Sequence, residues 1–166
     1  MSTGLDDLFE KSVPQFVASL NQTVRDALLE YERMCQAGQK GELSYIYISL
    51  LLSSVICRLP WLRIDFCDEN DRNDIAECCA NWDVQFVSNA LYRDIDASVE
   101  KKNMKDYEIE HACFDASSEY SQSFEKFLPQ IIDQYDVVKE INCRWHFGQY
   151  LGNTIVVREK QKDEIL

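Results

Sequence analysis

Glycine and proline are scarce in this chain of 166 residues, which contains only five and three of them. A fold made of many short strands needs more of both, because they supply tight turns and positive φ angles. Their scarcity therefore predicts long helices. Basic residues are also in the minority, with 17 Lys and Arg against 29 Asp and Glu and a net charge of −12. Such a surface repels phosphate backbones, so we expect no nucleic-acid partner.

The chain lacks the usual signatures of export and of nucleotide or cofactor chemistry. Its start, MSTGLDDLFEKS, has neither the basic nor the apolar region of a secretion signal. The seven cysteines are an odd number, so they cannot all pair, and we expect reduced thiols and a cytoplasmic location. Phosphate-binding glycine loops and the GxSxG nucleophile motif are also missing. The sequence thus predicts no cofactor.

The most apolar stretch covers residues 43–66, LSYIYISLLLSSVICRLPWLRIDF. Its first part, 43–59, contains no Gly, Pro or Asp and is too long for an ordinary strand, so length predicts a buried helix. Its composition, with Tyr45, Ile46 and Val55, favours a strand instead. A membrane span needs about 20 apolar residues, whereas this run contains four serines and ends at Arg58 and Pro60. We therefore expect a core helix and no membrane partner.

Strands are expected where apolar and polar residues alternate. Residues 61–67 have this period of two, and a second strand near 75–79 is expected to pair with them as a hairpin. The sequence TIVVR at 154–158 predicts a terminal strand, after a turn between Gly148 and Gly152.

Helices are expected where apolar residues recur at three and four positions. The clearest pattern spans 14–37 and stops at Gly38, and a short helix at 5–11 is expected to precede it. Further patterns start at Asn81, at Met104 and after Pro129, and they predict helices over 81–103, 104–128 and 131–138.

These elements predict a mainly α (α+β) fold. About five helices would surround the buried central helix at 43–59, with two or three short antiparallel strands on one side. We expect one globular domain over residues 1–166, with a frayed, charged tail at 159–166.

An acidic loop, CDENDRND, follows the strand at 61–67. A calcium-binding EF-hand starting at Asp68 is excluded, because Asn73 stands where glycine is needed and Cys79 where a bidentate glutamate is needed. Charged loops on a rigid scaffold are common recognition surfaces. We therefore predict a surface for a basic protein partner at the carboxylates Asp68, Glu69, Asp71 and Asp74.

Both histidines stand near cysteines, as His111 with Cys113 and Cys143 with His146. Two Cys and two His form a sensible zinc set, but on a helix residues i and i+2 diverge by about 200°. Whether the four residues meet in space is left open by the sequence, and we assign no metal ligand.

The function hypothesis follows from the charge and from the missing catalytic signatures. We expect a non-enzymatic, acidic protein-interaction domain, such as an immunity protein or antitoxin that masks a cationic toxin, or a regulatory subunit. The alternative is a metal-dependent enzyme with carboxylate, His and Cys ligands. Elemental analysis of the purified protein distinguishes the two hypotheses.

Overall fold

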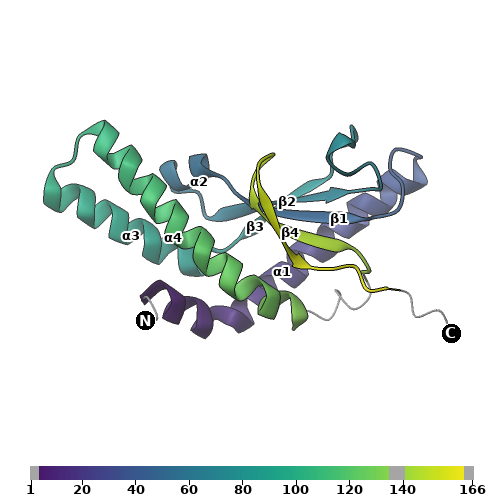
Figure 1. The fold of residues 1–166 in the computed structure, drawn as a ribbon, viewed down its shortest axis with the longest axis horizontal. Coiled ribbons are helices and arrows are strands. Elements are labelled where there is room, and N and C mark those ends of the chain that lie inside the picture. The colour runs from purple at the N-terminus through teal and green to yellow at the C-terminus, as the bar shows by residue number, and fades with distance from the viewer. Residues whose placement is uncertain (1–3, 135–140, 163–166) are drawn as a thin grey trace.

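A computed structural model describes residues 4–134 and 141–162. Its centre is a five-stranded sheet with the strand order β3-β2-β1-β4-β5, and α1 and α4 run along one side of it (Figure 1). The strands are β1 (Tyr45–Leu50), β2 (Trp61–Cys67), β3 (Cys79–Asp83), β4 (Arg144–Gln149) and β5 (Thr154–Arg158). The helices are α1 (Gly4–Gln36), α2 (Leu52–Ile56), α3 (Gln85–Lys102) and α4 (Asp106–Asp133), with a 3-10 turn η1 (Asp71–Asn73).

The helix predicted over residues 43–59 is wrong. This stretch forms β1, a tight bend at Leu51 and the short helix α2. The length argument failed because several short elements follow one another without a Gly or Pro between them, whereas the strand preference of Tyr45 and Ile46 was the correct signal. The stretch still lies at the centre of the fold, because β1 is the middle strand and Ile46 and Ile48 are fully buried.

The sheet is mixed and larger than the two or three antiparallel strands that the sequence predicts. β1 pairs with β2 in antiparallel register, with Ile48 opposite Ile64, and with β4 in parallel register, with Ile48 opposite Phe147. The sequence did not predict β4. Only Trp145 and Phe147 in this strand face the core, and two apolar residues are too few to form a clear alternating pattern. The strand predicted at 154–158 is confirmed as β5.

The predicted hairpin pairing is confirmed, but its second strand lies at 79–83 rather than 75–79. Trp82 decides the position, because its buried ring faces the helices and its Nε1 donates to Ser19 Oγ on α1 at 2.8 Å. The next helix consequently starts at Gln85 and not at Asn81. Asp83 accepts a hydrogen bond from the Gln85 backbone N–H at 2.9 Å.

The described residues form four α-helices, where the sequence predicts about five plus a central one. α1 continues through Pro14, so the separate helix at 5–11 does not exist. It ends as predicted at Gly38, which has φ +72° and a backbone N–H bonded to Cys35 O, while Gln39 N–H bonds to Met34 O. α4 likewise continues through Pro129 to Asp133, and the rest of the helix predicted over 131–138 lies mostly outside the described residues.

An aromatic cluster joins the helices to the sheet. Phe9 of α1 lies 4.8 Å from Phe124 of α4, measured between ring centroids, and Phe124 lies 5.7 Å from Phe147 of β4. Phe16 packs against Trp82 of β3 at 5.8 Å. The core therefore lies between one face of the sheet and the α1–α4 layer, and the opposite face of the sheet carries no helix among the described residues.

The predicted tail at 159–166 lies partly outside the described residues, and its described part is attached to the fold. Arg144 donates to Glu159 at 2.9 Å, and the Asn142 side chain bonds both the N–H and the C=O of Gln161. Among the described residues, no helix combines the length and the apolar character that crossing a bilayer requires.

Candidate functional site

The face of the sheet opposite the helices contains a cleft of about 240 Å³, which we call the sheet cleft. Its floor comes from β1 and β2, and its walls come from the β2–β3 loop and the β4–β5 turn. Side chains that line it include Lys40, Tyr47, Ser49, Arg63, Asp65, Cys67, Asp71, Arg72, Asp74, Glu77 and Tyr150.

The basic side chains of the sheet cleft are already paired. Arg63 donates to Asp65 at 2.7 Å and to Glu77, and its guanidinium lies 4.7 Å from the Tyr150 ring. Arg72 donates to the Gly152 carbonyl at 2.9 Å and lies 4.6 Å from the Tyr47 ring. These contacts occupy both guanidinium groups, and those of Arg72 tie the β2–β3 loop to the β4–β5 turn.

Two of the four loop carboxylates predicted to bind a partner are buried. Asp74 forms an ion pair with Lys40 in which the side chains are only 6% and 1% exposed. Asp68 accepts backbone hydrogen bonds from Gly41 at 3.1 Å and from Asn70 at 2.9 Å. Burial alone would raise the pKa of Asp68, but these two bonds and nearby Lys40 hold that pKa below its ordinary value. Both residues join the loop to the chain that follows α1.

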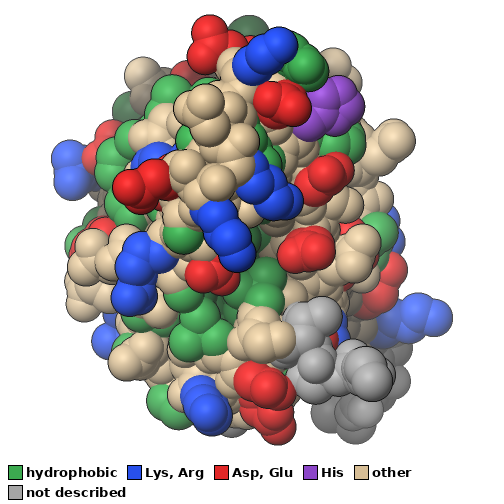
Figure 2. All heavy atoms as spheres, turned by 90° about the vertical axis from the view of Figure 1, so that its left-hand side faces the viewer, with side chains coloured by type: hydrophobic (Ala, Val, Ile, Leu, Met, Phe, Trp, Pro, Cys, Tyr) green, Lys and Arg blue, Asp and Glu red, His purple; other side chains and the backbone are tan. Residues whose placement is uncertain are grey.

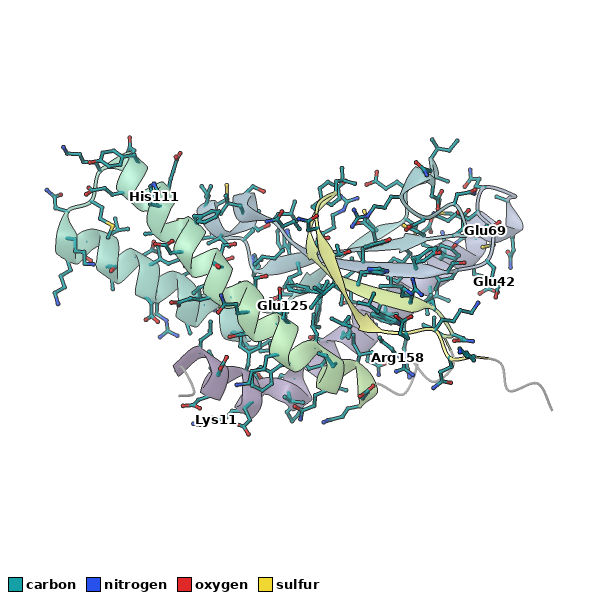
Figure 3. The ribbon with its side chains drawn as sticks, in the orientation of Figure 1. Lys11, Glu42, Glu69, His111, Glu125 and Arg158 are labelled. Atoms are coloured by element: carbon teal, nitrogen blue, oxygen red, sulfur yellow. The ribbon has the colours of Figure 1, made fainter. Side chains whose placement is uncertain are left out.

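The other two loop carboxylates differ from each other. Asp71 is half-buried and accepts a 2.5 Å hydrogen bond from the Tyr47 hydroxyl. Burial, and after it this hydrogen bond, raises the pKa of Tyr47. Glu69 is exposed at the end of the molecule far from His111 (Figure 3). The binding surface predicted for this loop stays a prediction, and Glu69 is its only exposed member.

Two cysteine thiols near the sheet cleft, those of Cys67 and Cys78, are poor nucleophiles. Burial raises the pKa of Cys67 to about 12 and that of Cys78 to about 11. Since the thiolate is the reactive form, these thiols react slowly near neutral pH. All seven cysteines are unpaired, and only Cys57 and Cys79 are exposed.

We expect alkylation of the native protein to discriminate among the seven thiols. At pH 7.5, the exposed thiols of Cys57 and Cys79 should react with iodoacetamide first, whereas buried Cys113 and Cys143 should react only after unfolding. Burial also raises the pKa of Cys143 to about 12. Peptide mass spectrometry at timed intervals measures the order. Modification of Cys143 as fast as Cys57 would show that the β4 region opens in the native state.

The metal ligands considered from the sequence do not form a cluster. His111 is exposed on α4, Cys113 is buried beside Arg58, and His146 stacks on Tyr47 at the open face of the sheet. Among the described residues, one group of three ligand atoms lies within 4.8 Å, formed by Asp65, Glu77 and Cys79. Arg63 already supplies positive charge to both of these carboxylates. The metal-dependent enzyme stays an untested alternative.

A second and larger hollow lies on the helical side of the sheet, between α4 and the β4–β5 hairpin. We call it the α4 groove, and its volume is about 690 Å³. Leu50 and Phe147 contribute to its floor. Its walls include Leu51, Leu52 and Ser53 near α2, Phe114, Ser117, Ser118, Ser121, Gln122 and Glu125 on α4, and Tyr150, Asn153, Thr154 and Ile155 on the hairpin.

The groove is open because α4 presents small side chains toward the hairpin. Ser117, Ser118 and Ser121 lie beside the buried stripe of α4 and line the hollow, and their small side chains fill less of the space beside the sheet than Leu or Phe would. Gly148 lets the hairpin curl beside this gap, because a Cβ at that position would lie 2.3 Å from the Asn153 carbonyl oxygen. The sequence signal for the groove was the polar interruption of the apolar stripe at DASSEYSQS, which alone does not reveal the opposing hairpin.

Acidic charge concentrates on α4. This helix contains seven Asp and Glu against the single Lys126, a net −6, and all seven carboxylates belong to exposed residues. α3 contains three acidic and three basic residues, and the end of the molecule shown in Figure 2 has both signs interspersed. The charge asymmetry thus runs along α4 and borders the groove at Glu125 (Figure 3). No protein-family model, curated protein or solved structure matches the chain.

Proposed function

We propose that this chain is a non-enzymatic, acidic protein-interaction domain that binds a basic protein through the exposed side of α4. The observation that carries this proposal is the net −6 of that helix, half of the charge of the whole chain. Three functional classes are consistent with an acidic surface of this kind: immunity proteins, antitoxins and regulatory subunits.

Electrostatics supports α4 as the docking side. Exposed like charges on one helix gain nothing from each other, and they contribute to binding only when a cationic surface approaches. Glu110, Asp115, Glu119 and Glu125 are exposed, so their carboxylates are accessible to Lys and Arg of a partner. The same charges repel nucleic acid. A cytoplasmic location belongs to the proposal, because it keeps the seven thiols reduced.

The experiment compares two variants of equal charge. The α4 variant carries Glu110→Gln, Asp115→Asn, Glu119→Gln and Glu125→Gln, which change only exposed side chains. The matched α1 variant carries Glu10→Gln, Asp26→Asn, Glu30→Gln and Glu32→Gln, and each variant has a net charge of −8 instead of −12. Each tagged protein is used to capture partners from its own cells at about 0.05 M salt, where charge attraction acts over about 10 Å or more.

We expect a basic protein that the wild type and the α1 variant retain and the α4 variant releases. With that partner purified, its association rate should fall about tenfold for the α4 variant alone, and the difference should shrink at about 0.5 M salt. Retention of the same proteins by all three would contradict the proposal, as would retention of none. Glu69→Gln, measured beside them, tests the acidic loop as a second surface.

A further inference from the structure

Exposed apolar side chains gather around the α4 groove. Leu52 of α2 is 40% exposed, Phe114 of α4 is 59% exposed and Ile155 of β5 is 44% exposed, and all three line the same hollow. They come from segments more than 30 residues apart in sequence, so the fold and not local composition brings them together. A hollow with exposed apolar side chains on several of its walls is suited to binding an apolar segment.

We infer that the α4 groove binds an amphipathic, lysine- or arginine-rich helix of the basic partner. This inference rests on the proposed function and adds to it the contact surface and the shape of the partner segment. The apolar face of the helix would contact Phe114, Leu52 and Ile155, and its basic face would lie along the carboxylates of α4 from Glu125 toward Glu110.

The place of the groove in the fold favours a helical occupant. Ile155 pairs with Phe147, so both side chains point to the helical side of the sheet, where Phe147 is covered by Phe124 and Ile155 is uncovered. A helix laid beside α4 would therefore extend the existing helical layer over the hairpin. Helices pack at about 8–10 Å between axes, and the serines on α4 permit that approach.

Charge selects the partner over a second copy of this chain. Two copies would bring two helices of net −6 and two molecules of net −12 together, which costs free energy at low salt. A basic helix, in contrast, would be attracted to the acidic helix, so the electrostatic contribution to binding would be favourable. Among the described residues, the walls of the groove contain one charged side chain, Glu125, so the groove itself recognises apolar residues, and the adjoining helix surface recognises the cations.

The test uses a fluorescent peptide of about 18 residues, about 27 Å long as a helix, with leucines on one helical face and lysines on the other. Binding to the full chain is measured by anisotropy. The groove variant is Phe114→Ser with Ile155→Ser. Its matched control is Leu29→Ser with Ile75→Ser, which removes two exposed apolar side chains outside the groove, 61% and 101% exposed. All three proteins keep the same charge.

We expect the groove variant to bind the peptide at least about tenfold more weakly than the wild type, and the control variant to stay within about twofold. A scrambled peptide of the same composition, and one with glutamate in place of lysine, should each bind about tenfold more weakly to the wild type. Circular dichroism of both variants confirms that they are folded. Equal binding by the groove and control variants would overturn the inference, and so would a groove-dependent dimer of the chain in light scattering.

The outcomes for the groove and for the proposed function are distinguishable. If the captured partner is released from the α4 charge variant yet binds the Phe114→Ser, Ile155→Ser variant as tightly as the wild type, the groove is wrong and the proposed function stands. If the peptide distinguishes the groove variant from its control but no basic protein is captured, the groove stands as a helix site and the proposed function fails.

Discussion

Replacing Ile48 with aspartate is expected to unfold most of the protein at 25 °C. Ile48 lies in the middle strand of the sheet, is fully buried, and is flanked by Ile64 on β2 and Phe147 on β4. A carboxylate there would lie among apolar core side chains, with no cationic partner among the described residues. The cost is more than about 4 kcal/mol, which is comparable to the whole free energy of unfolding of a small domain. Far-ultraviolet circular dichroism and urea titration measure it.

Two further aspartate variants should lose less stability than Ile48→Asp, and they serve as comparisons for it. Leu29→Asp changes a side chain that is 61% exposed and should alter the free energy of unfolding by less than about 0.5 kcal/mol. Leu51→Asp should have an intermediate effect, because Leu51 is half-buried at the bend between β1 and α2. A buried helix over residues 43–59 would not produce this order, so an Ile48→Asp variant as stable as Leu51→Asp would contradict the β1 assignment.

The sequence predicted the parts of the fold that depend on local periodicity. The helical pattern at 14–37 and its end at Gly38 are confirmed, because an amphipathic stripe and a glycine with positive φ act within a few residues. The strand at 61–67 is confirmed for the same reason, since its residues alternate cleanly. β1 was assigned wrongly because a strand buried on both faces has no alternation and resembles a buried helix.

Sequence patterns could not predict the parallel pairing of β4 with β1 or the α4 groove. β4 pairs with β1 across about a hundred residues, and no local signal specifies which strand lies beside β1. The groove requires Phe114, Leu52 and Ile155 to meet, and each of them alone is an ordinary surface residue. Sequence patterns also do not reveal how the side chains of the acidic loop are oriented. Its carboxylates were correctly recognised as a cluster, but Asp68 and Asp74 are turned inward by backbone N–H groups and Lys40.

Replacing Lys40 with methionine is expected to destabilise the protein by about 3–5 kcal/mol. The Lys40 side chain is 1% exposed, it pairs with Asp74, and its ammonium lies 5.2 Å from the Tyr31 ring of α1. Methionine fills a similar volume but removes the charge, so the buried Asp74 carboxylate loses its only ion-pair partner among the described residues. Thermal and urea denaturation measure the loss. Arg33→Met removes a surface ion pair whose side chains are 73% and 54% exposed, and it should cost less than about 1 kcal/mol.

A second substitution tests whether the unpaired charge causes the loss. In Lys40→Met with Asp74→Asn no buried charge remains, and the single asparagine oxygen can still accept one of the two backbone N–H groups, those of Asp68 and Ala76, that bond separate oxygens of Asp74. Replacing a buried ion pair by neutral groups is often nearly neutral in free energy, so this double variant should recover part of the stability that Lys40→Met loses, less the cost of the one backbone hydrogen bond that asparagine cannot accept. If the double variant is no more stable than Lys40→Met alone, the unpaired charge of Asp74 does not account for the loss. In that case the link between the α1–β1 loop and the β2–β3 loop depends mainly on the hydrogen bonds of Asp68.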